Sequence, residues 1–222
     1  IQDKGMTMIE NGFSKQIQNR IANSQDGTIF VNSDFVDIAS SETIRRNLNR
    51  LTKAGILNRV FNGVYEKPKY SHFLSEYVSP DPNAIAKALA RTYHWTIAPC
   101  GNTAVNLLGL STQVPSTWSY ISDGPYKTYE WNNTKLEMKH RTNKEISRLS
   151  YKTILVIQAI KTLGKDYITA EEIQLLSQNL SDEEKRICLS EAREATDWIY
   201  EIIKKACSEV KNEKNSMLTS YC

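Results

Sequence analysis

Apolar residues near the start of the chain recur at every fourth position. This spacing aligns them along one stripe of an α-helix and predicts an amphipathic helix over residues 8–24. The stripe consists of Ile9, Phe13, Ile17 and Ile21. Asp26-Gly27 interrupts the pattern, and the β-branched and aromatic run at 28–31 predicts a short strand.

Two more helices are expected after this strand. Asn32 or Ser33 can cap a short helix that runs to about Ala39, because both side chains can accept a hydrogen bond from a free backbone N–H. Ser41 can cap a third helix over residues 42–54 in the same way.

A hairpin follows the third helix. Gly55 stands where helices often end in a left-handed residue. Two short runs that predict strands, 56–61 and 64–66, then flank Asn62-Gly63, a pair typical of two-residue hairpin turns. Helix, strand, helix, turn, helix and hairpin is the element order of a winged helix-turn-helix.

The second half of the chain has a different pattern. A linker rich in Ser and Pro ends at Ser79-Pro80-Asp81-Pro82, and helices are expected at 83–93 and 102–108 around a strand at 95–98. Three runs rich in aromatic and β-branched residues predict a three-stranded antiparallel meander. These runs are 117–122, 126–131 and 135–140. From Asn143 onward the sequence favours helices, at 151–163, 169–178 and 181–210.

These patterns predict an α+β fold with two domains. A winged helix-turn-helix occupies residues 1–70, and a mixed domain with a small antiparallel meander and a C-terminal helical region occupies residues 80–210. The polar residues 211–222 are expected to be a disordered tail.

The charge of the chain is unevenly distributed. The whole chain of 222 residues carries a net charge of only +3, so affinity for nucleic acid must come from a local patch. From Thr43 to Lys69 there are seven basic residues against one acid, Glu66, whereas residues 1–42 hold three basic residues against six acids. The positive charge therefore lies on the third helix and the hairpin.

The third helix is the first candidate site. Ile44, Leu48 and Leu51 lie on one side, and the other side carries arginine, asparagine and lysine. Arginine can pair with guanine and asparagine with adenine, whereas lysine mostly contacts phosphate. The candidate DNA-binding residues on the helix and the hairpin are Arg45, Arg46, Asn49, Arg50, Lys53, Arg59 and Asn62. A solvated helix face and a protein–protein module are the alternatives.

The second candidate site would be catalytic. Asp123 is expected at a strand end, and Glu137 and Lys139 lie on a following strand. Two carboxylates and a lysine in this order resemble metal-dependent nucleases, in which the carboxylates hold a divalent ion. So short a pattern is common by chance, and alternation would place Glu137 and Lys139 on a solvent face. Cys100, near a helix start, more readily packs as a small apolar side chain. We therefore expect no enzyme activity.

Nothing in the composition indicates a cofactor, a metal site or a membrane segment. The four cysteines lack metal-ligand spacing, and the longest apolar run, residues 154–157, is too short to span a bilayer. Residues 1–20 lack the continuous apolar stretch of a signal peptide. We expect a cytoplasmic protein with reduced thiols.

Two groups of short motifs follow one another along the chain. The N-terminal motifs are Ile29 to Phe35, Leu48 to Leu51, Ala54 to Leu57 and Gly63-Val64-Tyr65. The later ones are Pro99, Gly101-Asn102, Ala104, Asn106, Leu108 to Ser111, Gln113-Val114-Pro115, Ser122-Asp123-Gly124, and the segment 151–165 with its terminal Leu163-Gly164-Lys165. The order and spacing of these motifs resemble AbiEi-type antitoxins of type IV toxin–antitoxin systems, over about residues 10–165 and more loosely to 207.

The resemblance implies a repressor that binds inverted repeats in its own promoter. It also implies an antitoxin that counters a nucleotidyltransferase toxin without a stable complex. Family DNA contacts fall on basic residues of the third helix and wing, here Arg45, Arg46, Arg50, Lys53 and Arg59. Wings of the family often carry a basic residue where this chain has Asn62, which weakens phosphate contact there. We expect a monomer in solution or a weak dimer on DNA. A stand-alone regulator and a nuclease targeted by a winged helix are the alternatives.

Overall fold

The computed structural model describes residues 3–141 and 148–208, with side chains from Gly12 onward. Contacts divide the described residues into two units. The N-terminal unit comprises residues up to Trp95 together with 130–133, and the C-terminal unit comprises 96–129 and the residues from 134 on. The fold class is α+β, as the sequence predicts.

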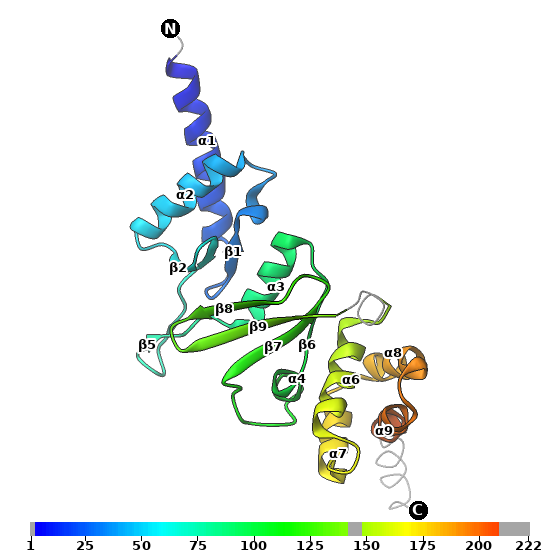
Figure 1. Ribbon diagram of the computed structural model, residues 1–222. Coiled ribbons are helices and arrows are strands. Elements are labelled where there is room, and N and C mark those ends of the chain that lie inside the picture. The colour runs from blue at the N-terminus through cyan, green and yellow to red at the C-terminus, as the bar shows by residue number, and fades with distance from the viewer. Residues whose placement is uncertain (1–2, 142–147, 209–222) are drawn as a thin grey trace, which may run out of the picture. The chain divides into compact units, whose positions relative to one another are not determined.

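The N-terminal unit has the element order of a winged helix-turn-helix (Figure 1). Its elements are α1 (Asp3–Ala22), β1 (Ile29–Val31), the 3₁₀ turn η1 (Asn32–Phe35), α2 (Ser41–Lys53), β2 (Asn58–Phe61) and β3 (Val64–Glu66). Strand β3 lies between β1 and β2 and is antiparallel to both. The expected two-residue turn at Asn62-Gly63 is confirmed, since Phe61 pairs with Val64.

The second helix is shorter than the sequence indicates. Only the single 3₁₀ turn η1 forms where a helix from Asn32 or Ser33 to Ala39 was expected. The carbonyl of Asp34, which would accept the α-helical hydrogen bond from Ile38, instead accepts one from Arg20 at 2.6 Å. The Ile38 N–H therefore turns to the carbonyl of Phe35 at 2.9 Å, a 3₁₀ bond.

Isoleucines from the predicted stripe of α1 build the core of this unit. Ile17 and Ile21 are buried against Phe35 and the apolar side of α2, while Phe13 is half-buried and the side chain of Ile9 lies outside the described residues. Helix α2 begins one residue earlier than expected: Ser40, and not Ser41, caps it by accepting from the N–H of Thr43 at 3.5 Å.

The stretch expected to be a linker has structure of its own. Strands β4 (Tyr70–Ser71) and β5 (Glu76–Tyr77) form a short antiparallel hairpin. Helix α3 (Pro82–Tyr93) follows, capped by Asp81, and it packs on β1. Arg91 of α3 donates to the carboxylate of Asp34 at 3.1 Å, which places this helix with the N-terminal unit.

The strands of the C-terminal half form a mixed sheet instead of the predicted antiparallel meander. The sheet has the order β6-β7-β9-β8, and β7 and β9 are parallel. These strands are β6 (Ile97–Pro99), β7 (Thr117–Ser122), β8 (Lys127–Trp131) and β9 (Thr134–His140), and α4 (Asn102–Leu107) connects the first two. Strand β9 buries Leu136 and Met138, whereas β8 exposes most of its side chains. The more apolar strand therefore takes the central position and β8 takes the edge.

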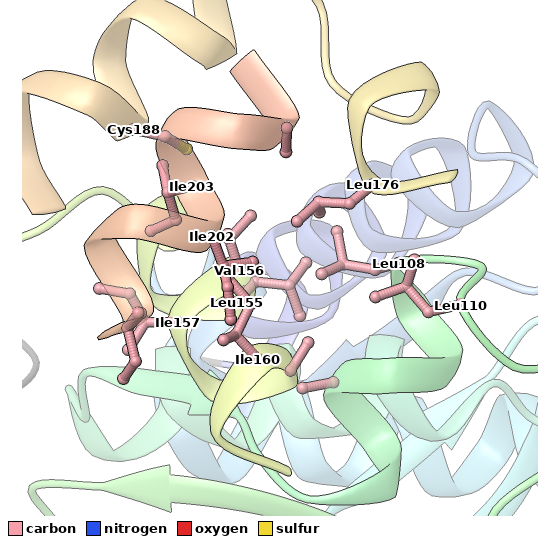
Figure 2. Close-up of a cluster of buried hydrophobic side chains, with 14 of the residues drawn as sticks. Leu108, Leu110, Leu155, Val156, Ile157, Ile160, Leu176, Cys188, Ile202 and Ile203 are labelled. Atoms are coloured by element: carbon pink, nitrogen blue, oxygen red, sulfur yellow. The ribbon is translucent and has the colours of Figure 1, made fainter. Parts of the chain in front are cut away.

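Within the described residues, four helices complete the C-terminal unit. They are α6 (Tyr151–Leu163), α7 (Ala170–Gln178), α8 (Asp182–Glu191) and α9 (Asp197–Ser208). The single long helix expected over 181–210 is broken by the turn η2 (Ala192–Glu194). The break lets α9 fold back, so that Ile202 and Ile203 join Leu155 and Val156 of α6 in one core (Figure 2). The predicted onset of helix at Asn143 and the predicted disorder of 211–222 lie outside the described residues.

Candidate nucleic-acid interface

Helix α2 separates its apolar and polar side chains onto opposite sides. Ile44, Leu48 and Leu51 are each at most 2% exposed and face the core. The opposite side carries Arg45, Arg46, Asn49 and Lys53, of which Asn49 is half-buried and the rest are exposed. The helix thus presents three cations and one amide beside the hairpin β2–β3. We call these four residues and Arg59 the basic face.

Two cations of the basic face have no competing partner. Among the described residues, Arg45 and Lys53 make no hydrogen bond or ion pair. Arg46 is paired with Glu42 at 2.6 Å, four residues earlier on the same helix, and both side chains are largely exposed. Exposed pairs of this kind contribute only about 0.3–0.5 kcal/mol, so a phosphate can displace Glu42 at small cost.

Arg50 is turned away from the basic face. Its guanidinium donates to Ser14 Oγ of α1 and, at 2.8 Å, to Asn47 Oδ1. Asn47 is buried and donates to the carbonyl of Thr43. Arg50 therefore ties α2 to α1, and its place among the candidate contact residues rests on sequence alone.

The hairpin is bonded directly to α2 through Arg59. The guanidinium of Arg59, on β2, donates to Asn49 Oδ1 and lies over the ring of Tyr65 at 5.5 Å. The hydroxyl of Tyr65, on β3, donates to the same Asn49 oxygen at 3.4 Å. The carboxamide of Asn49 is thus held in one orientation, and helix and hairpin present their polar groups together.

Asn62 lies at the tip of the hairpin and is exposed. Gly63 beside it has a φ of +83°, a conformation that an L side chain rarely adopts. The turn brings no charge to the tip, and Lys67 beyond β3 is occupied, because it donates to the carbonyl of Ser24 at 2.7 Å and pairs with Asp26 at 3.2 Å.

The only acid between Thr43 and Lys69 is removed from the surface. Glu66 is 3% exposed, and burial raises its pKa to about 7. A carboxyl with this pKa is half protonated at neutral pH. The surface of this segment is therefore positive without a fixed negative charge among its exposed side chains.

The sequence-predicted catalytic residues are not brought together. Glu137 pairs in register with Ser119, and the last residue of β7, Ser122, lies about 10 Å further along the strand at 3.3 Å per residue. Asp123 follows Ser122, beyond the end of the strand. The Asp123 carboxylate accepts from the N–H of Thr96 at 2.9 Å. Glu137 bonds Lys135 at 2.9 Å and Lys139 at 3.7 Å, and these cations lower its pKa. The two carboxylates therefore share no ligand position.

The described residues contain neither a metal-ligand cluster nor a membrane-spanning helix. No group of three or more His, Cys, Asp or Glu side chains could hold a metal ion there. None of the helices in the described part combines the length and apolar composition that a membrane crossing needs. Burial raises the pKa of the thiols of Cys100 and Cys188, which suits the packing role expected for Cys100.

Sequence reasoning missed three residues that shape the basic face. Ser14 and Asn47 hold Arg50, and Tyr65 supports Arg59. The sequence could have indicated that Asn47 is buried, because helical spacing places it between Ile44 and Leu48 on the apolar side of α2. Tyr65 belongs to the Gly63-Val64-Tyr65 motif, but its side-chain role had no signal, because a short central strand buries consecutive residues on both faces and alternation does not apply to it.

Comparison with known proteins gives a family but no activity. No curated protein matches this sequence. A family model described as a family of unknown function, DUF6088, matches residues 16–187. The match begins inside α1, includes the whole basic face and ends inside α8, so it covers parts of both units. The chain belongs to the DUF6088 family.

Proposed function

We propose that this protein is a DNA-binding repressor that grips duplex DNA with the basic face of its N-terminal unit. In winged helix-turn-helix proteins the second helix of the motif enters the major groove, and here that helix is α2. The single observation that carries the proposal is the set of unpaired or weakly paired cations on α2 beside a fixed Asn49. Arginine and asparagine suit base edges, and Lys53 suits phosphate.

The orientation of Asn49 supports sequence-specific binding. An asparagine N–H can donate to an acceptor on a base edge. In the free protein Asn49 Oδ1 already accepts from Arg59 and Tyr65, so the amide N–H group is what remains to contact a base. Arg59 and Asn49 would act together, and the loss of either would disturb the other. A solvated helix face has no need of such a preset side chain.

We further propose the cellular role that the resemblance to AbiEi-type antitoxins implies. The protein would repress its own operon through inverted repeats and counter a nucleotidyltransferase toxin in the cytoplasm. The acidic helices of the C-terminal unit, for example the Asp182-Glu183-Glu184 start of α8, would be repelled by DNA. Antitoxin activity is therefore assigned to this unit and DNA binding to the N-terminal one. We propose no catalytic step and no cofactor.

A gel-shift assay against the upstream region of the gene tests DNA binding. The wild-type chain should shift this fragment and leave a scrambled fragment of equal length free. Changing Arg45, Arg46 and Lys53 to Ala should abolish the shift without altering the circular dichroism spectrum. A triple variant that binds as tightly as wild type would refute the assignment of α2.

The two activities can be separated in full-length protein. The triple variant, expressed beside a toxin gene found next to this gene, should lose promoter repression and still restore growth. Failure to restore growth, with the variant folded and present at wild-type level, would contradict the assignment of antitoxin activity to the C-terminal unit. The absence of a neighbouring toxin gene would favour a stand-alone regulator with the same DNA contacts.

A further inference from the structure

The N-terminal unit contains a pocket beside the hairpin β2–β3. The pocket has a volume of about 390 Å³ and is lined from α2, β2 and β3, from Tyr77 and the segment that follows it, and from Trp131 and Asn132. Small-molecule sites in proteins have volumes of about 300–1,000 Å³. The pocket is large enough for a ligand the size of a single aromatic ring with a polar group.

Glu66 gives this pocket an unsatisfied acceptor. Its side chain is 3% exposed and has no hydrogen-bond or ion-pair partner among the described residues. Leaving a buried carboxyl unpaired costs free energy, and buried polar groups in folded proteins nearly always have a partner. Arg59 lines the same pocket, but its guanidinium is engaged by Asn49 and the ring of Tyr65.

Trp131 gives the pocket an unsatisfied donor. The residue is 5% exposed, and its indole Nε1 is buried without a hydrogen-bond partner within the described part of the chain. Its ring lies 5.9 Å from that of Phe61, which fixes it against β2. A buried acceptor and a buried donor thus line one pocket, with Leu57, Val78 and Pro80 as apolar walls.

We propose that this pocket binds a small organic cation, an amidinium or protonated amine on a flat apolar body. The positive group would pair with the Glu66 carboxylate, and the apolar body would lie against Trp131 and the aliphatic walls. A charge-assisted hydrogen bond to a buried carboxylate is about twice as strong as a neutral one, which favours a cation over a neutral donor. The Trp131 N–H remains for an acceptor on the ligand or a bridging water.

The surroundings of Glu66 fix the pH dependence of binding. Strand β1 places Ile29 opposite it, β2 contributes Arg59, and Tyr77 comes from β5. Thr52 of α2, Trp131 and Asn132 add no titrating side chain, and Glu130 does not line the pocket. Burial raises the pKa of Glu66 to about 7. A cation binds the ionised form, so its affinity should rise about tenfold from pH 6 to pH 8.

The test uses benzamidine as the cationic probe and benzamide as its neutral analogue, with the full chain. Four tryptophans give four indole N–H signals in a ¹H–¹⁵N spectrum, and Trp131→Phe identifies that of Trp131. Benzamidine should shift this signal and leave the other three in place, more tightly at pH 8 than at pH 6. Benzamide should have no such effect.

Two variants decide whether Glu66 is responsible. Glu66→Gln should abolish the benzamidine shift, and Glu76→Gln, which removes an equal charge from an exposed site outside the pocket, should keep it. No shift in the wild-type chain, an equal response to benzamide, or an unchanged response in Glu66→Gln would each overturn the proposal. None of these outcomes depends on DNA.

The pocket also has a direct connection to α2. Arg59 lines it and bonds Asn49, so a ligand that moves Arg59 releases or tightens the carboxamide of the basic face. This regulatory step rests on the proposed DNA binding. Saturating benzamidine should change operator affinity at least threefold in the wild type and not in Glu66→Gln. An unchanged affinity at proven saturation would overturn the regulatory step and leave the binding site standing.

Discussion

Glu66→Gln should stabilise the N-terminal unit at high pH and leave it unchanged at low pH. The wild-type carboxyl is buried without a partner, and its pKa of about 7 exceeds the ordinary value of 4.5. Between these two pH values the unfolded chain releases the proton while the folded protein keeps it. The folded state therefore binds more protons, and the wild type loses stability as the pH rises through this interval.

The size of this stability difference follows from the difference between the folded and unfolded pKa of Glu66. Each pH unit of difference between the folded and unfolded pKa corresponds to about 1.4 kcal/mol, so the full cost of ionising Glu66 is about 3 kcal/mol. The amide of Gln is nearly isosteric with the protonated acid and never ionises. The variant and the wild type should therefore be equally stable at pH 4.5, and the variant should lead by up to about 3 kcal/mol at pH 8.

Urea unfolding at several pH values, followed by the indole N–H signals, measures this difference for each unit. Trp95 and Trp131 belong to the N-terminal unit, and Trp118 and Trp198 to the C-terminal unit. The urea midpoint should shift for the first pair only, and Glu76→Gln should shift neither. A stability difference that is the same at pH 4.5 and pH 8, or that favours the wild type at pH 8, would refute the reasoning.

Three further predictions concern the interior of the fold, the basic face and the rejected catalytic site. Asp34→Ala should lower the free energy of unfolding of the N-terminal unit by about 2 kcal/mol, because the carboxylate accepts from the N–H of Val31 and from Arg91; urea titration measures it. A double-mutant cycle of Asn49→Ala and Arg59→Ala should show a coupling of about 1 kcal/mol in operator affinity, and strict additivity would contradict their joint action. Supercoiled DNA should remain intact with Mg²⁺ or Mn²⁺, and nicking that Glu137→Ala abolishes would restore the nuclease alternative.

The sequence predicted the N-terminal unit well because local signals there agree with one another. The apolar stripe of α1, the stop at Gly55 and the Asn-Gly turn each depend on residues close in the chain. The prediction of a longer second helix was wrong because Arg20 donates a hydrogen bond to the carbonyl of Asp34, fourteen positions further along the chain. Periodicity within a short window does not detect such a contact.

The C-terminal unit was harder to predict for a similar reason. All three runs expected as strands are strands, but their order depends on which strand buries more apolar surface against the rest of the unit. The break at η2 depends on where α9 finds its partners, α6 and α7. The candidate site shows the same limit: helical spacing places Arg45 and Lys53 outward, but only tertiary contacts show that Arg50 bonds Ser14.

The measurement that tests the central claim most directly is the salt dependence of operator binding by three proteins. They are the wild type, Arg45→Ala with Lys53→Ala, and a control, Lys161→Ala with Lys165→Ala, which removes the same charge from exposed positions in the C-terminal unit. Fluorescence anisotropy with the upstream fragment should give wild-type and control curves that coincide. The first double variant should bind at least tenfold more weakly, with a slope of log affinity against log salt reduced by about 1–2. Equal affinity and slope for all three proteins would contradict DNA binding by the basic face.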